Sequence, residues 1–183
     1  MNRRALILAV AAATLATAAH AALATGAAAP DFTAPAFLAG QPFTFNLAEA
    51  LKKGPVVVYF FPAAHTKGCN IEAHLFAEAA DQFKAQGASI IGVTAGNTDQ
   101  LGAFSKETEY CSGKFPVASD ASGAIAKSYD SSLIFRPGWS DRTSYVIAPG
   151  GKIILSYSDL KPDDHVNKTL TAIKQLNAAK KAS

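Results

Sequence analysis

The chain has 183 residues, which is enough for one well-packed domain and too few for two domains of ordinary size. Its formal net charge is +3, and two of the positive charges, Arg3 and Arg4, lie in a segment that we expect to be removed. Without them 15 basic residues stand against 14 acidic ones, and so nearly neutral a protein gives no electrostatic argument for a nucleic-acid partner.

The first 21 residues have the features of a secretory signal peptide. Arg3 and Arg4 make the start positive, an alanine-rich apolar run continues to about Ala18, and residues 19–21 fit the small-x-small cleavage rule. The apolar run is shorter than the roughly 20 residues that a membrane span needs. We therefore expect a signal peptide over residues 1–21 and a single domain over residues 22–183. We expect the mature protein to be periplasmic or secreted, with no stable membrane association after cleavage.

The mature chain is expected to begin with an extended segment, residues 22–35, which is rich in alanine, proline and glycine. Residues 42–47 alternate like a short edge strand, and residues 47–53 predict a brief helix that ends before Gly54. The run 56–61 is continuously β-branched and aromatic, which predicts a strand buried on both faces of a sheet.

The loop after this strand carries the first candidate for chemistry. Pro62 ends the apolar run, and Cys69 follows just as a helical pattern begins. Unpaired backbone N–H groups and the macrodipole at a helix N-terminus favour an anion, here the thiolate, which is the nucleophilic form of a cysteine. The alternative is a cysteine that only packs, since free cysteine is among the most buried residue types. The neighbours His65 and Lys67 favour the reactive thiol.

Two helices and a strand are predicted next. Apolar residues recur at three- and four-residue steps over residues 70–85, which marks one buried face of a helix. Residues 89–94 predict another central strand. A second helix is expected over residues 98–110, with Thr98 as its N-cap.

The C-terminal half completes an alternation of strands and helices. The turn Ala148-Pro149-Gly150-Gly151 indicates a hairpin between two strands. In chain order we expect a short strand, a short helix, the two hairpin strands and a last amphipathic helix: residues 115–120, 122–129, 142–147, 152–157 and 166–176. Because strands and helices alternate first and a hairpin closes the sheet, we predict an α/β sandwich with a mixed central sheet.

The loop and the helix start resemble a known active site. The string Pro62-x-x-x-Thr66-x-x-Cys69 resembles the signature of the peroxiredoxins, and residues 68–73 resemble the G-C-x-x-E-A of their bacterioferritin-comigratory (PrxQ-like) branch. An A-P-D-F at residues 29–32, an F-P-x-x-S-D at residues 115–120 and an R-x-[TS]-[FY]-V-I setting at residues 142–147 resemble further family segments. The resemblance extends over most of residues 28–176.

The resemblance implies a thioredoxin-like (peroxiredoxin) sandwich and a thiol-dependent peroxidase that reduces hydrogen peroxide or organic hydroperoxides. It implies that Cys69 is the nucleophile and becomes a sulfenic acid, with the hydroxyl of Thr66 nearby and Pro62 shaping the loop. It also implies that Arg142 lies beside the sulfur, where a guanidinium favours the thiolate and offers planar donors to peroxide. The alternative for Arg142 is a strand-end arginine that faces solvent. We take Glu72 as a supporting residue.

The chain departs from the resemblance at the second cysteine. Many PrxQ-like proteins carry a resolving cysteine five residues after the first, where this chain has His74. The remaining candidate is Cys111, at the end of the second predicted helix or in the loop after it. The resemblance then implies a Cys69–Cys111 intrachain disulfide that a thioredoxin-like or other exported thiol reductant reduces. Two cysteines in an oxidising compartment also allow a structural disulfide.

Two other functions stay open at this point. One is a thiol–disulfide oxidoreductase, although such enzymes usually have C-x-x-C at the helix start and this chain has Glu72 there. The other is a non-catalytic thioredoxin-fold binding module with a structural disulfide. We expect no metal or organic cofactor, because the cysteines and histidines show no recognised ligand spacing. Phe135 and Trp139 are candidates for contact with a reductant or a second subunit, and both a monomer and a homodimer are compatible with the sequence.

Overall fold

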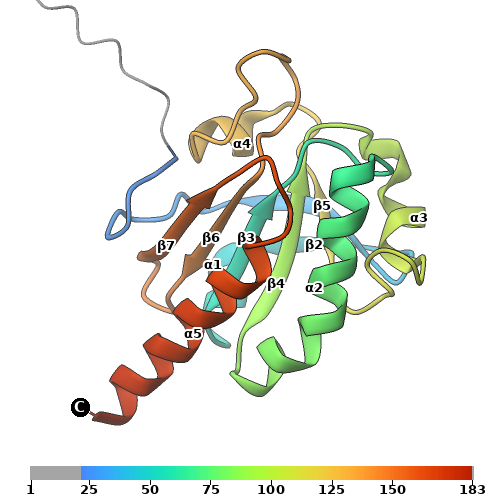
Figure 1. Ribbon diagram of the computed structural model, residues 1–183. Helices are drawn as coiled ribbons and strands as arrows, with labels where there is room; N and C mark the ends of the chain where they lie inside the picture. Colours follow the sequence, from blue (N-terminus) through green and yellow to red (C-terminus); the bar gives the residue numbers. More distant parts are fainter. Residues whose placement is uncertain (1–21, 183) are drawn as a thin grey trace, which may run out of the picture.

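The computed structural model describes residues 22–182, so the expected signal peptide lies outside the described residues. Seven strands form one mixed sheet in the order β2-β1-β5-β4-β3-β6-β7 (Figure 1). The strands are β1 Thr33–Leu38, β2 Gln41–Asn46, β3 Val56–Phe60, β4 Ser89–Thr94, β5 Val117–Ser119, β6 Thr143–Ile147 and β7 Ile153–Ser158. The helices are α1 Leu47–Leu51, α2 Lys67–Ala85, α3 Leu101–Lys106, α4 Ala124–Ser128 and α5 His165–Ala182, with a 3₁₀ turn at Thr98–Gln100.

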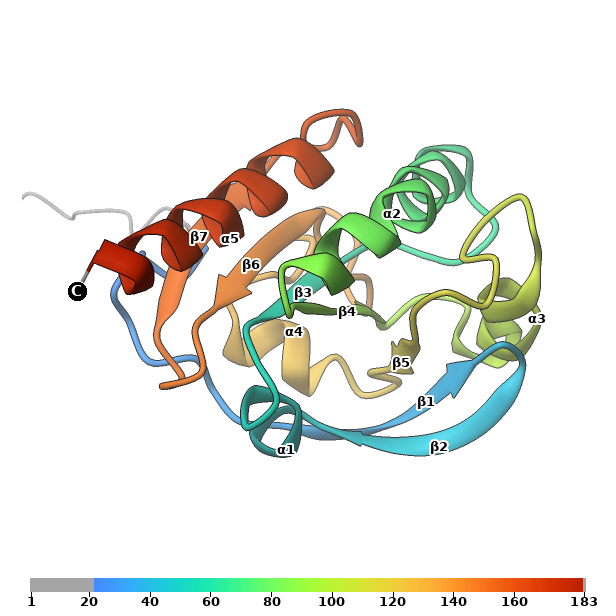
Figure 2. The same cartoon turned by 90° about the horizontal axis from the view of Figure 1, so that it is seen from below.

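The centre of the fold is β3, the strand that the sequence predicts to be buried on both faces. All five of its residues are buried. It pairs in parallel with β4 and antiparallel with β6, so the sheet is mixed as predicted. Helices α2 and α5 lie against one face of the sheet and α1 and α4 against the other (Figure 2). The predicted α/β sandwich is confirmed, and it places the end of β3 between two helical layers.

Helix α2 begins three residues earlier than the sequence predicts. Its N-cap is Thr66, whose backbone is extended (φ −100°, ψ 146°), and Lys67 is the first helical residue. The apolar stripe that indicates this helix starts only at residue 70, because Lys67 and Gly68 contribute no apolar side chain to it. The earlier start places Cys69 inside the first turn of the helix.

Strand β1 begins inside the extended segment expected over residues 22–35 and continues to Leu38, beyond the predicted segment. Its buried side chains are the small Ala34 and Ala36, which give a weak apolar signal. Pro35 has no N–H to donate and normally argues against a central strand. Here β5 pairs only with Ala36 and Phe37, so Pro35 is paired on one side alone, with β2.

The helix expected over residues 98–110 is shorter in the structure. The 3₁₀ turn at Thr98–Gln100 leads into α3, which ends where Glu107 adopts extended backbone angles (φ −62°, ψ 129°). Asn97, in the left-handed region (φ 53°), precedes the turn, so the assignment of Thr98 as N-cap is wrong. Residues 107–114 form successive turns instead of a helix.

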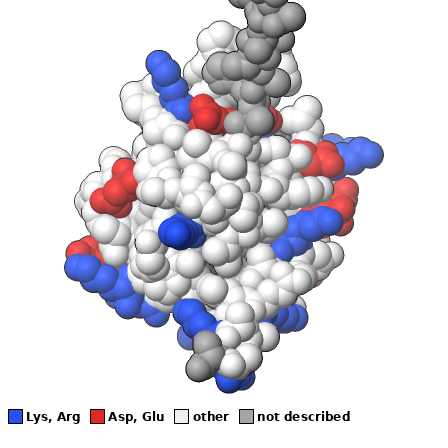
Figure 3. Space-filling view, turned by 90° about the vertical axis from the view of Figure 1, so that its left-hand side faces the viewer, with Lys and Arg blue, Asp and Glu red and all other residues white. Residues whose placement is uncertain are grey.

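The surface carries charges of both signs. On the face shown in Figure 3, acidic and basic side chains both occur around a largely uncharged centre, so its described residues offer no continuous basic stripe. Among residues 22–182, no helix has the length and apolar character that crossing a bilayer requires.

Candidate active site

The loop between β3 and α2 is fixed to the end of β4. The hydroxyl of Thr94 donates to the carbonyl of Pro62 (3.1 Å), and the side-chain amide of Asn97 donates to the carbonyl of Ala64 (2.9 Å). Pro62 itself is half-buried. These bonds hold the loop, and therefore the start of α2, at the same end of the sheet as the C-terminal ends of β3 and β4.

Cys69 lies in the first turn of α2 and is only 1% exposed. The first backbone N–H groups of a helix have no partner one turn earlier, so they and the helix dipole favour a negative charge on this sulfur. The hydroxyl of Thr66 does not cap the helix, because it donates to the carbonyl of Ala63 (3.0 Å). With its proton used in this way, the Thr66 oxygen is left to accept a hydrogen bond.

Arg142 reaches this helix start from the residue before β6. It is 4% exposed, so it does not face solvent, and its Nη2 lies 3.5 Å from the Sγ of Cys69. Its Nη1 donates to the carboxyl of Glu72, and its Nε donates to the carbonyl of Leu160 (2.9 Å). Since each of the three nitrogens has a different acceptor, the plane of the guanidinium is fixed beside the sulfur.

Gly68 makes room for this guanidinium. A Cβ at position 68 would lie 2.9 Å from the Nη2 of Arg142, closer than real Cβ contacts allow. We expect Gly68→Ala to displace the guanidinium and to slow the reaction of Cys69 with hydrogen peroxide by about 10- to 100-fold, because catalytic groups tolerate little misplacement. Stopped-flow kinetics measure this rate. The matched control is Gly150→Ala, where the new methyl group meets open space; equal rates in the two variants would contradict the expectation.

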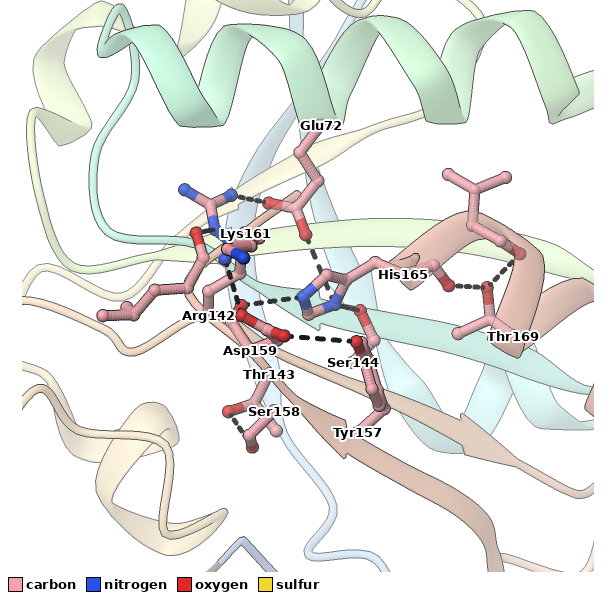
Figure 4. Close-up of polar contacts among 12 residues, drawn as sticks. Glu72, Arg142, Thr143, Ser144, Tyr157, Ser158, Asp159, Lys161, His165 and Thr169 are labelled. Carbon is pink, nitrogen blue, oxygen red and sulfur yellow. Dashed lines mark hydrogen bonds and ion pairs between the residues drawn. The ribbon is translucent and has the colours of Figure 1, made fainter. Parts of the chain in front are cut away.

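Glu72 is a fully buried carboxyl behind Arg142. Burial raises its pKa to about 8, although the neighbouring guanidinium of Arg142 acts in the opposite direction. Its Oε2 accepts from Arg142, while its Oε1 lies 3.6 Å from Nδ1 of His165. Figure 4 shows Glu72 between these two side chains. The supporting role expected from the sequence therefore takes the form of direct contact with the arginine.

Two further polar residues of the site have no signature in the sequence. His165, the first residue of α5, and Ser144, on β6, are both fully buried and lie 2.8 Å apart, Nδ1 to Oγ (Figure 4). A single histidine at a helix start and a single serine in a strand form no recognised pattern. Only the packing of α5 against β6 brings them to Glu72.

Cys111 is a buried free thiol in the turns of residues 107–114. It belongs to the same apolar cluster as Cys69, and burial raises the pKa of its thiol well above the ordinary range. Its neighbour Tyr110 packs edge-on against the ring of His65, with ring centroids 5.4 Å apart. The segment is thereby held against the loop that precedes Cys69, and burial disfavours the thiolate form of Cys111 in this conformation.

The remaining candidates lie outside this cluster. His74, at the position of the usual resolving cysteine, is half exposed on α2 and 3.4 Å from Glu78. Phe135 is 76% exposed, whereas Trp139 is partly covered by Arg136, whose guanidinium carbon lies 3.3 Å from the centre of the indole. The expected aromatic surface therefore consists of Phe135 rather than of both rings.

The family model described as the AhpC/TSA family matches residues 25–156. The chain belongs to the AhpC/TSA family. Among similar proteins, "Peroxiredoxin Q, chloroplastic" of Sedum lineare is 29% identical over 143 residues, which cover 74% of this chain and 75% of that protein. The protein of the same name from Populus jackii is 30% identical over 134 residues, 73% of this chain and 61% of that protein.

A solved structure with the same fold is that of peroxidoxin BcpB from Mycobacterium tuberculosis. It is 29% identical in sequence, has a TM-score of 0.73, and the match covers 83% of this chain and 97% of that one. This AhpC/TSA protein thus has the predicted thioredoxin-like peroxiredoxin fold, and it is a thiol-dependent peroxidase. The alternatives of a thiol–disulfide oxidoreductase and of a non-catalytic binding module are set aside.

Proposed function

We propose that Cys69 is the peroxidatic cysteine of this peroxidase, that Arg142 and Thr66 bind the peroxide beside it, and that Pro62 shields the site. The observation that carries the proposal is the 3.5 Å contact between Nη2 of Arg142 and Sγ of Cys69 in a buried position. A fixed guanidinium and a helix N-terminus both favour the thiolate, and peroxide reduction requires this form of the cysteine.

The chemistry follows from these groups. The Cys69 thiolate attacks one oxygen of the peroxide, an S–O bond forms, and the O–O bond breaks. The sulfur is oxidised to a sulfenic acid, and the departing oxygen takes up a proton and leaves as water or an alcohol. The guanidinium of Arg142 donates to the oxygens as negative charge develops on them, and the Thr66 oxygen accepts the peroxide O–H.

We also propose that Cys111 resolves the sulfenic acid. Its thiol would condense with Cys69 to a disulfide and release water, and a thioredoxin-like or other exported thiol reductant would restore both thiols. Disulfide formation needs the two Cα atoms within about 7 Å, and we propose that the turns of residues 107–114 and the first turn of α2 rearrange to form it. The proposal is supported by the position of both cysteines in one apolar cluster.

Peroxide titration followed by mass spectrometry tests the assignment of Cys69. We expect one equivalent of hydrogen peroxide to convert the reduced protein to a Cys69–Cys111 disulfide, and a Cys111→Ser variant to a sulfenic acid on Cys69 alone. Cys69→Ser is the control and should stay unmodified. First oxidation at Cys111, or no oxidation at stoichiometric peroxide, would reject the assignment.

The cellular setting is a proposal of its own. The positive start, the apolar run and the cleavage motif of residues 1–21 support export to the periplasm or beyond the cell, and N-terminal sequencing of the mature protein would test it. Phe135 and its neighbour Ile134, which are 76% and 72% exposed, lie in the loop that leads to Arg142. We propose them as a contact surface for the reductant or for a second subunit.

A further inference from the structure

In the buried polar cluster behind Arg142, the hydrogen-bond partners indicate whether Glu72 and His165 carry a proton. Glu72 and His165 are fully buried, and Oε1 of Glu72 lies 3.6 Å from Nδ1 of His165 (Figure 4). Among the described residues, Oε1 of Glu72 has no hydrogen-bond partner. An ionised carboxylate oxygen without a donor is unfavourable at such a position, because burial removes it from the solvent that would stabilise its charge.

The hydrogen-bond partner of Nε2 shows which nitrogen of the His165 ring carries the proton. Nε2 of His165 lies 2.9 Å from the backbone carbonyl oxygen of Asp159, and a carbonyl oxygen can only accept. Nε2 is therefore protonated. In the neutral ring Nδ1 is then an acceptor, and it accepts from the hydroxyl of Ser144 at 2.8 Å. Nδ1 has one lone pair, and Oε1 of Glu72 lies 3.6 Å from the same nitrogen, so the Ser144 hydroxyl and Glu72 meet at a single acceptor.

Two acceptors that face each other in a buried place require a proton between them. Burial raises the pKa of Glu72 to about 8 and lowers the pKa of His165, so both shifts favour a neutral carboxylic acid beside a neutral imidazole. The distance of 3.6 Å closes to a hydrogen bond with a shift of a few tenths of an ångström. The acid proton of Glu72 then shares the lone pair of Nδ1 with the Ser144 hydroxyl in a three-centre hydrogen bond.

The protonation state of Glu72 changes how strongly the guanidinium of Arg142 stabilises negative charge on the Cys69 sulfur. When Glu72 is neutral, the Cys69 thiolate is the one anion among Glu72, Cys69 and Arg142. The guanidinium of Arg142 then stabilises the thiolate without competition from a carboxylate. When Glu72 loses the proton, the carboxylate competes with the sulfur, and with the oxygen of the departing group, for the same guanidinium.

We propose that His165 is a positioning residue of this peroxidase: by accepting the proton of Glu72 it keeps that carboxyl neutral, and so leaves the charge of Arg142 to the sulfur and the peroxide. The inference rests on the proposed roles of Cys69 and Arg142. The titratable and charged groups around the pair come from every element packed against it: Cys69 on α2, Tyr59 on β3, Arg142 before β6, Tyr157 on β7, and Asp159 and Asp164 in the loop before α5.

The test compares pH profiles of the second-order rate constant for oxidation of Cys69 by hydrogen peroxide. For the unchanged protein we expect the rate to fall by about tenfold as the pH rises through the range around 8 and above, where Glu72 loses its proton. Glu72→Gln, which stays neutral, should show no fall of its rate over this pH range. His165→Asn places amide N–H groups beside Oε1, favours the carboxylate, and should move the fall to lower pH.

The matched control is Thr169→Val. Thr169 is fully buried one helical turn after His165, and its hydroxyl donates to the carbonyls of His165 and Val166 within α5. We expect its pH profile to equal that of the unchanged protein. A His165→Asn profile that coincides with that of the unchanged protein, or an equal shift in Thr169→Val, would overturn the proposal.

A second measurement does not depend on activity or on the folding of variants. Nitrogen NMR of the ¹⁵N-labelled reduced protein should show His165 as a neutral ring protonated at Nε2, with an Nδ1 signal that changes at the pH where Glu72 ionises. A ring protonated at Nδ1, or charged at pH 7, would overturn the proposal. If these signals appear as expected but peroxide does not oxidise Cys69, the proposed function fails and the proton assignment stands.

Discussion

Replacing Arg142 with methionine should slow the reaction of Cys69 with hydrogen peroxide by about 10²- to 10³-fold, the usual effect of removing a fixed donor to developing negative charge. Methionine fills a similar apolar volume but offers neither charge nor donors to the sulfur 3.5 Å away. Competition with a peroxidase of known rate, at pH 7, measures the constant for the unchanged protein and the variant. Arg142→Lys should fall between the two, because it keeps a charge without the planar fork.

The stability of the Arg142 variant needs its own control. Removing one partner of a buried ion pair typically destabilises a protein by about 3–5 kcal/mol. The loss should be smaller here, because burial raises the pKa of Glu72 to about 8 and the carboxyl is then already neutral at pH 7. The double variant Arg142→Met/Glu72→Gln controls for this loss, because it leaves no ionisable carboxyl beside the new side chain. If that double variant is folded and still reacts at the full rate, Arg142 has no part in peroxide binding.

Replacing Cys111 with alanine should leave the first turnover intact and abolish turnover supported by a thioredoxin-type reductant. Cys111 is fully buried and lies outside the contacts of Arg142, so its loss does not change the groups around Cys69. The cavity left by one sulfur atom should cost about 1 kcal/mol of stability. The first turnover is measured by stopped-flow with reduced protein, and the steady state by consumption of the reductant.

The control for this experiment is Ser112→Ala, in the same turn. The Ser112 hydroxyl donates to the carbonyl of Thr108 (2.6 Å), so this change loosens the segment without removing a thiol. Its steady-state rate should remain close to that of the unchanged protein. If the Cys111→Ala variant also turns over at the full rate, the sulfenic acid is reduced directly and the cycle uses one cysteine.

The parts of the fold with a strong local pattern could be predicted from the sequence. The apolar run of β3 and the hairpin of β6 and β7 are confirmed, since continuous apolar or alternating residues bounded by turn residues report directly on strands. Strand β1 could not be predicted, because alanines supply its buried face. The early end of α3 could not be predicted either, because it depends on how residues 107–114 pack against the rest of the chain.

The same distinction applies to the site. Cys69 and Arg142 are 73 positions apart, and no periodicity connects them; the resemblance to a family motif placed them together in expectation, and the structure brings them into contact. Glu72 was visible as the glutamate of the G-C-x-x-E-A resemblance, but its contact with Arg142 was not. His165 was not visible at all, because its role depends on α5 lying against β6 and on a carbonyl in the loop before it.

The position of Cys111 in consecutive turns limits how much of the fold has to move in each catalytic cycle. Ser112 and Gly113, both with positive φ, and the bonds of this segment back to Glu107 and Ser105 keep it folded without any strand partner. The proposed cycle through Cys111 would rearrange this corner and leave every ladder of the seven-stranded sheet in place. The strands that position Arg142 would then keep their hydrogen bonds through each turnover.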